Sequence, residues 1–123
     1  MAETGDLENQ RVDRPWGYYT TIHGNDLLGH KVKEIVVLPG GRLSLQSHNQ
    51  RSEHWVIVQG NALVQVGDDF LELNKNQHVY IPKKTLHRIE NIGKDNVVFI
   101  ETQIGDYLGE DDIVRYSDDY NRG

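Results

Sequence analysis

Short runs of β-branched and aromatic residues, separated by turn residues, recur along almost the whole chain. Glycine, proline, asparagine and aspartate fill the gaps about every ten residues, and Gly67-Asp68-Asp69 between two such runs is a hairpin signature. The expected strands are residues 16–22, 30–38, 42–48, 53–59, 62–66, 70–73, 78–82, 86–91 and 96–104. Short strands joined by tight turns at this spacing predict an all-β sandwich or barrel.

The two ends of the chain depart from this pattern. Residues 1–13 are polar and acidic, and we expect them to form a flexible arm ahead of a single domain at 14–123. In the tail, 107–121, the carboxylates at 110–112 precede Ile113. Because carboxylates favour a helix N-terminus, one short C-terminal helix is predicted there.

Length and composition limit the classes of partner and compartment. A chain of 123 residues with 37% hydrophobic and 26% charged residues is expected to be one soluble globular domain without a membrane span. The sequence has no cysteine, which excludes disulfides and thiolate metal sites. Its polar N-terminus does not resemble a secretory signal, so we expect a cytoplasmic protein. The net charge of −6 argues against nucleic acid as the main partner. An anionic ligand would therefore need a local cluster of cations.

Residue types that bind metals gather just before an apolar run. Because alternate side chains of a strand share a face, Ser44, Gln46 and His48 are expected on one face. If 53–59 is the next antiparallel strand, the turn between the two strands brings Glu53 next to His48. The segment is therefore a candidate metal site.

Two interpretations of this segment remain open from the residues alone. A carboxamide, an imidazole and a carboxylate suit a borderline divalent cation, and His87 offers a second imidazole further along the chain. A Gln-x-His pair is also common on solvated surfaces, so an exposed polar loop is the alternative. His54 neighbours Glu53 and should face the opposite side of a regular strand, as a packed or interface residue.

Two spaced motifs favour the metal site. Residues 40–60 read G(x)5QxH(x)4E(x)6G and resemble the first cupin motif, with glutamine at the first of its two usual histidines. Residues 76–91 read N(x)5P(x)4H(x)3N and resemble the second motif, with Asn76 and Lys84 in place of its usual glycines. The resemblance implies a double-stranded β-helix (jelly roll) around one divalent ion, with Zn²⁺ expected ahead of Mn²⁺, Co²⁺, Ni²⁺ or Fe²⁺. The implied protein ligands are Gln46, His48, Glu53 and His87.

Several segments show a more specific resemblance than the cupin motifs. The chain is similar to the isomerase domain of type II phosphomannose isomerases in residues 14–19, 39–48, 51–60, 79–91 and 100–115. The resemblance implies a metal-dependent aldose-ketose isomerase that interconverts mannose 6-phosphate and fructose 6-phosphate through an enediolate. Such proteins usually carry a mannose-1-phosphate guanylyltransferase domain as well, which 123 residues cannot hold, so nucleotidyl transfer is not expected of this sequence.

The expected substrate is a sugar phosphate, so the site needs a proton-transfer group and cations. Glu101 is a candidate catalytic residue if its strand face points inward, and the resemblance keeps Arg88 as a second one although it neighbours inward His87. We interpret Arg14, Trp16 and Arg115 as structural or interface residues. The expected substrate-binding residues are Ser44, Arg51 (at the rim, in the turn between two ligands), Lys83 and Lys84.

Apolar residues lie on both faces of the strand at 53–59, with Val56 and Val58 opposite Trp55 and Ile57. One face fills the barrel, and the other must pack on the N-terminal strand or on a second subunit; a homodimer is expected. Two other functions remain open: a cupin enzyme acting on another sugar phosphate or nucleotide sugar, and a non-catalytic metal cupin that binds carbohydrate.

Overall fold

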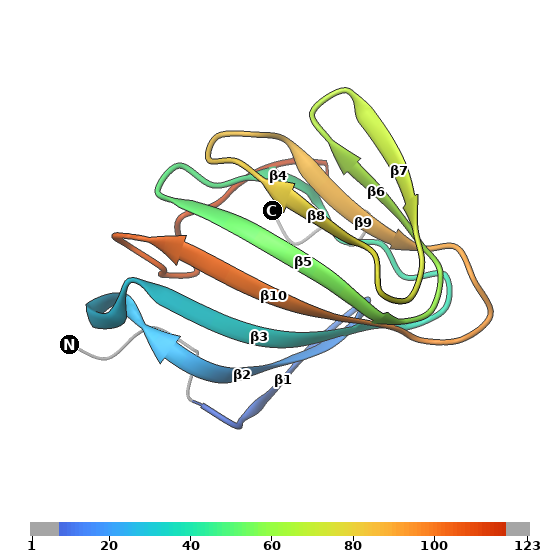
Figure 1. Ribbon diagram of the computed structural model, residues 1–123, viewed down its shortest axis with the longest axis horizontal. Coiled ribbons are helices and arrows are strands. Elements are labelled where there is room, and N and C mark those ends of the chain that lie inside the picture. The colour runs from blue at the N-terminus through green and yellow to red at the C-terminus, as the bar shows by residue number, and fades with distance from the viewer. Residues whose placement is uncertain (1–7, 118–123) are drawn as a thin grey trace.

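Two antiparallel β-sheets face each other in the computed structural model, which describes residues 8–117 (Figure 1). The six-stranded sheet runs in the order β1 (Arg11–Arg14), β2 (Gly17–Asn25), β3 (His30–Val37), β10 (Val97–Gly105), β5 (Arg51–Gln59) and β8 (His78–Ile81). The five-stranded sheet runs β11 (Val114–Ser117), β4 (Leu45–Ser47), β9 (His87–Asn91), β6 (Ala62–Val66) and β7 (Asp69–Leu73). A strand lies in each predicted β segment, and the predicted double-stranded β-helix is confirmed.

The core lies between the sheets because the strands alternate buried and exposed residues. In β5, Glu53, Trp55 and Ile57 are buried, whereas His54 and Val56 between them are exposed. Trp55 meets Phe99 of β10 with ring centroids 5.0 Å apart. The buried apolar cluster comprises Trp16, Tyr19, Ile35, Val37, Trp55, Ile57, Ala62, Val64, Leu73, Ile81, Ile89, Val97 and Phe99. This packing holds the inward side chains of both sheets in fixed positions.

The chain crosses from one sheet to the other between β4 and β5. β4 pairs with β9 and β11, while β5 pairs with β10 and β8, so the two are not hairpin neighbours. The expectation that His48 and Glu53 meet across an antiparallel pair is therefore wrong in its geometry. They approach each other across the interior, which is how this fold brings side chains of both sheets to one point.

The two residues that replace the usual glycines of the second motif adopt the backbone conformation that glycine favours. Asn76 has φ 74° and Lys84 has φ 61°. Asparagine tolerates this left-handed region, whereas for lysine it costs about 1–2 kcal/mol. The Lys84 N–H donates to the His48 carbonyl oxygen at 2.7 Å, so this turn is fastened to the segment that carries a candidate ligand.

The described part of the predicted N-terminal arm belongs to the sheet. β1 pairs with β2 from Arg11↔Thr20 to Arg14↔Gly17, and Glu8 forms a further bridge to Thr21. Residues 8–13 are thus ordered by backbone pairing, while residues 1–7 of the predicted arm lie outside the described residues.

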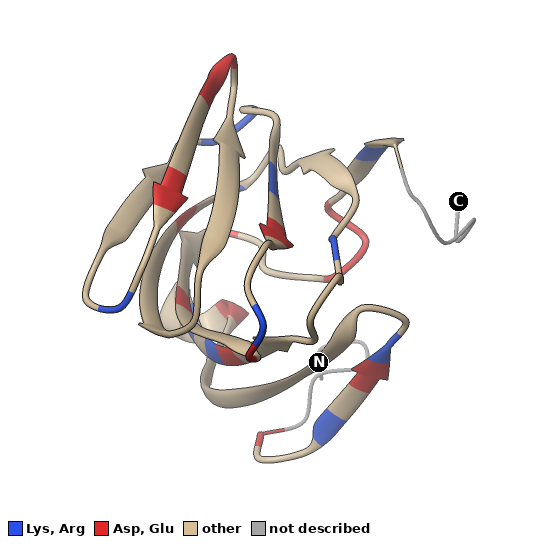
Figure 2. Ribbon diagram, turned by 90° about the vertical axis from the view of Figure 1, so that its right-hand side faces the viewer, with Lys and Arg blue, Asp and Glu red and all other residues tan. Residues whose placement is uncertain are grey.

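The predicted C-terminal helix is wrong for the residues that the structure describes. Val114–Ser117 form β11, which pairs with β4, and residues 118–121 of the predicted segment lie outside the described range. The neighbouring carboxylates, red in the loop before β11 in Figure 2, have other partners. Asp112 accepts hydrogen bonds from the N–H groups of Asn49 and Gln50 at 3.1 and 2.9 Å, so it caps another loop instead of a helix.

Helical structure is sparse in the part of the chain that is described. Residues 8–117 contain one short 3-10 helix, η1 (Asp26–Leu28), and no helix there is long and apolar enough to cross a membrane.

Candidate metal centre

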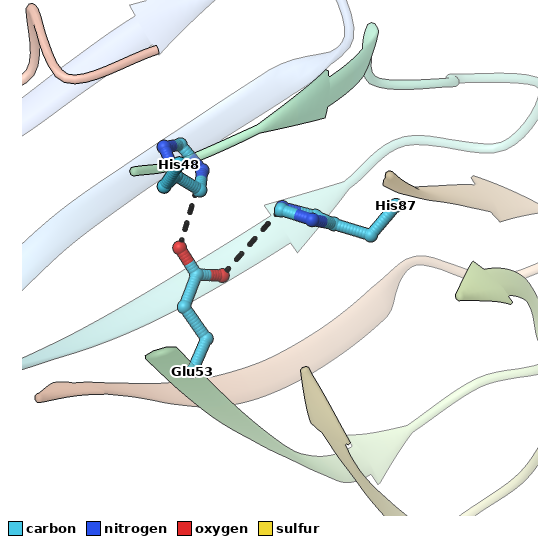
Figure 3. A group of neighbouring side chains, drawn as sticks. All are labelled: His48, Glu53 and His87. Carbon is cyan, nitrogen blue, oxygen red and sulfur yellow. Dashed lines mark ion pairs between the residues drawn. The ribbon is translucent and has the colours of Figure 1, made fainter. Parts of the chain in front are cut away.

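Two histidines and one glutamate converge in the interior between the sheets. His48 follows β4, Glu53 lies on β5, and His87 begins β9. Figure 3 shows the Glu53 carboxylate directed toward both imidazoles. His48 Nε2 lies 3.3 Å from one Glu53 oxygen and His87 Nε2 lies 4.0 Å from the other. All three residues are buried, and their ligand atoms lie within 4.8 Å of one another, which is close enough to share one ion.

Backbone carbonyl groups fix the orientation of both imidazoles. His48 Nδ1 donates to the carbonyl oxygen of Asp112 at 2.6 Å, and His87 Nδ1 donates to that of Thr85 at 2.9 Å. Each ring therefore keeps its proton on Nδ1 and presents Nε2 to the interior. Such outer hydrogen bonds are typical of metal-bound histidines, because they fix both the tautomer and the ring orientation.

The charge states in this triad suit a divalent cation. Burial lowers the pKa of His48 to about 4, so this imidazole is neutral at pH 7. Burial alone would raise the pKa of the Glu53 carboxyl, but Arg51, together with His48 and His87, holds that pKa well below its usual range. Trp55 Nε1 also donates to Glu53 at 2.9 Å. The triad thus offers an ionised carboxylate between imidazole nitrogens, which is a typical donor set for Zn²⁺ and related ions.

Gln46, the fourth ligand implied by the motif, lies beside the triad. It pairs with His87 in the register of β4 and β9, and it lines the same cavity. Its Nε2 donates to the Ser44 hydroxyl at 3.0 Å, which leaves the amide oxygen as the end that suits a cation. Ser44 is fully buried and is not among the residues that line the cavity. Its observed contact orients Gln46, in contrast to the substrate contact that the sequence predicted.

The triad opens onto a solvent-connected cavity of about 130 Å³ between the sheets. The cavity wall carries both carboxylates and cations, and the chain as a whole has a net charge of −6. The charged lining residues are Arg14, Lys33, Arg51, Glu53, Arg88, Glu101, Glu110 and Arg115. Five cations against three carboxylates give the wall an excess of positively charged side chains, which suits a small anionic ligand.

Arg51 lies inside the cavity, although the sequence predicted it in a turn at the rim. It is the first residue of β5 and is 5% exposed. Its Nε donates to Glu53 at 2.8 Å, and one terminal nitrogen donates to His48 Nε2 at 3.2 Å. The other terminal nitrogen is buried without a hydrogen-bond partner. The rim prediction is wrong because β5 starts early enough to put Arg51 and Glu53 on the same inward face.

The Glu101 side chain points inward. A catalytic role was predicted for this residue only if its strand face points inward. It lies on β10, is buried and lines the cavity. Burial, reinforced by the nearby Glu53 carboxylate, raises its pKa well above the usual value for a glutamate. Gln103 Nε2 donates to the Glu101 carboxyl at 3.1 Å, and Lys33 is its register partner on β3.

The other predicted cations are placed differently. Arg88 is half-buried and lines the cavity, but its guanidinium donates to the carbonyl oxygens of Leu43 at 3.1 Å and Ser117 at 3.5 Å. It therefore ties β9 to neighbouring backbone. Lys83 and Lys84 are exposed on the turn before β9 and are not among the lining residues of the cavity. The structure does not bring these two lysines to the triad.

Several lining residues were not recognised from the sequence as part of the site. Lys33 is buried and lies on the inward face of β3 with Ile35 and Val37, so strand alternation alone could have placed it inside. Arg14, Trp16 and Arg115 were interpreted as structural or interface residues. The lining residues that sequence reasoning missed include Arg14, Trp16, Lys33, Gln103, Glu110 and Arg115.

Residues 3–118 match the sequence profile of the family described as mannose-6-phosphate isomerase C-terminal. The chain belongs to this family. It is 49% identical over 114 residues to the xanthan biosynthesis protein XanB of Xanthomonas campestris pv. campestris (strain B100), covering 93% of this chain and 24% of XanB. It is 49% identical over 112 residues to the alginate biosynthesis protein AlgA of Pseudomonas aeruginosa, covering 90% and 23%. A mannose-1-phosphate guanylyltransferase of Escherichia coli (strain K12) is 45% identical over 114 residues, covering 93% and 23%. The chain thus spans about a quarter of the length of these relatives.

Solved structures agree with the fold. An oxalate decarboxylase structure matches with a TM-score of 0.74 at 19% identity, over 87% of this chain and 30% of that chain. A double-stranded β-helix protein of Klebsiella pneumoniae matches with a TM-score of 0.69 at 13% identity, over 95% and 90%. These likenesses establish the cupin fold, and function rests on the site.

Proposed function

We propose that this chain is a metal-dependent isomerase that interconverts mannose 6-phosphate and fructose 6-phosphate. The observation that carries the proposal is the buried His48–Glu53–His87 triad at the wall of an open, cation-lined cavity. The chain's membership of the mannose-6-phosphate isomerase C-terminal family supports the choice of substrate. Zn²⁺ is the expected ion, and Gln46 is its expected fourth protein ligand.

The reaction moves a hydrogen between C2 and C1 of the sugar, and negative charge develops on the sugar oxygens as it does so. When bound, a divalent ion at this triad supplies positive charge and Lewis acidity close to those oxygens. The ligand atoms are held by backbone hydrogen bonds on both histidines, so they need not reorganise during the reaction.

Arg51 is the expected donor to a sugar oxygen. One of its terminal nitrogens is buried without a partner, in a side chain whose Nε donates to Glu53 at 2.8 Å. Leaving a buried donor unsatisfied costs about 1–3 kcal/mol, and more when the group is charged. A substrate oxygen that accepts this N–H would remove that cost, so the guanidinium is preorganised for a ligand in the cavity.

Glu101 is the expected proton carrier. Three carboxylates line the cavity: Glu53 is bound by Arg51, Glu110 pairs with Lys33, and Glu101 is bound by no cation among the described hydrogen bonds but accepts one from the Gln103 amide at 3.1 Å. In the proposed step the ionised form of Glu101 takes the proton from C2 of mannose 6-phosphate and returns it to C1, while the proton of the O2 hydroxyl passes to O1. Arg88, the other predicted catalytic residue, is held by backbone carbonyls and has no role in this step.

A coupled assay for fructose 6-phosphate tests the proposal directly. Purified protein loaded with Zn²⁺ should turn over mannose 6-phosphate, lose that activity with a chelator and regain it with added metal. Elemental analysis should find about one ion per chain. Turnover of a different sugar phosphate or a nucleotide sugar alone would establish the second function, and saturable sugar binding without turnover would establish the third.

We also propose that the chain forms a homodimer through the outer face of the six-stranded sheet. Val56, Val58 and Tyr80 are 44%, 45% and 51% exposed on adjoining strands. Val58→Glu should convert a dimer to a monomer, because a charge in a buried apolar interface is strongly unfavourable. Light scattering after size exclusion measures this, with Phe70→Glu on β7 as the control that should stay dimeric. A monomeric wild-type protein would refute the homodimer.

A further inference from the structure

We propose that Arg14, Lys33 and Arg115 form the phosphate-binding end of the cavity, and that the Glu110 carboxylate occupies part of this end until the phosphate displaces it. The inference rests on the proposed function, since it names the contacts of the same substrate. All four residues line the cavity that contains the triad. The sequence had instead predicted Arg51, Lys83 and Lys84 as the substrate-binding cations.

Two of these cations meet at one aromatic ring. Lys33 Nζ lies 4.2 Å from the centroid of Tyr19, and Arg14 Cζ lies 5.5 Å from the same centroid. The ring stabilises positive charge and so permits two cations to sit close together. Lys33 is 3% exposed, which makes it a buried cation that needs an anionic partner.

Glu110 supplies that partner in the present arrangement. Its Oε2 lies 2.7 Å from Lys33 Nζ, and its side chain is 34% exposed. Glu110 lies in the loop before β11 and lines the cavity. Lys33 and Glu110 thus pair at this end, and Arg14 and Arg115 line the same cavity. A phosphate dianion carries more negative charge than a carboxylate and offers more acceptor oxygens, so it can replace Glu110 at Lys33 with a net electrostatic gain.

The remaining cations of the cavity wall have other tasks. Arg51 binds Glu53 and His48 of the triad, and Arg88 binds backbone carbonyl groups. The triad is built from β5, β9 and the end of β4, whereas the proposed phosphate end is built from β1, β3 and β11. One elongated ligand would then place its reacting end at the triad and its anionic end at the proposed phosphate end.

Calorimetric binding of mannose 6-phosphate to the metal-loaded protein tests the inference. Lys33→Met should weaken binding about 10- to 100-fold, because it removes a charged hydrogen bond, and it should leave the metal content unchanged. Arg14→Met should act in the same direction. Glu110→Gln should tighten binding about 2- to 5-fold, because it removes the internal competitor. Lys94→Met, at an exposed lysine in another loop, is the charge-matched control and should bind as the wild type does.

Wild-type affinity in both Lys33→Met and Arg14→Met would overturn the inference, as would a loss confined to a Lys83→Met/Lys84→Met double variant. Arg14→Met and Glu110→Gln keep the test decisive if melting curves show that Lys33→Met does not fold. Inorganic phosphate separates this inference from the isomerase proposal. If the wild type does not turn over mannose 6-phosphate but binds inorganic phosphate, and Lys33→Met does not, the isomerase proposal fails and the anion site stands.

Discussion

Replacing His87 with alanine should remove the bound metal and the isomerase activity together. His87 is buried, and its Nε2 faces the Glu53 carboxylate, so alanine deletes one ligand of the triad without changing the other two. Loss of an outer partner of a metal-bound histidine already costs about 10- to 100-fold in metal affinity, and loss of the ligand itself is expected to cost more. Elemental analysis and the coupled assay on the same preparation measure both effects. His48→Ala should behave in the same way.

His54→Ala provides the matched control for these variants. His54 neighbours Glu53 on β5, but it is exposed on the opposite face of the sheet, where it contacts Tyr80. Its metal content should equal that of the wild type. If His87→Ala and His48→Ala both kept metal and activity, the ion would have to bind elsewhere and the ligand assignment would be wrong.

Glu101→Gln should lower kcat by about 100- to 10,000-fold, the usual contribution of a general acid or base. Glutamine keeps the size of the side chain and can still hydrogen-bond to Gln103, so metal content and KM for mannose 6-phosphate should change little. In deuterated water, the wild type should introduce deuterium at C1 of fructose 6-phosphate, and the variant should lose this exchange. NMR measures the exchange independently of the coupled assay.

Glu34→Gln is the corresponding control, because Glu34 neighbours Lys33 on β3 but is exposed on the outer face. A Glu101→Gln variant with wild-type kcat and undiminished exchange would assign the proton transfer to another group. A parallel fall in metal content would instead show that Glu101 acts by supporting Glu53, with which it shares a hydrogen bond.

The strands and the triad could be predicted from sequence because both depend on regular spacing. Alternation of apolar residues locates β5 and β10, and the spacing of the two motifs identifies His48, Glu53 and His87. The way in which these three residues meet could not be predicted from adjacent strands. It depends on the chain crossing between sheets after β4, which is a property of the tertiary topology.

The cationic side of the cavity was harder to predict because long-range contacts decide the role of each charge. Glu110 and Asp112 look like the start of a helix, yet one pairs with Lys33 and the other caps the backbone at 49–50. These partners lie more than sixty residues away in the chain. Likewise, Lys83 and Lys84 are near His87 in sequence, but their turn carries them to the outside.

The triad draws its donors from both layers of the sandwich, and this has a mechanical consequence. Glu53 belongs to the six-stranded layer, whereas His48 and His87 are attached to strands of the five-stranded layer. An ion held by all three would therefore act as a cross-link, and the layers could not separate without releasing it. Resistance to heat and proteolysis should then rise with free metal, by about 1.4 kcal/mol for each tenfold increase above the dissociation constant.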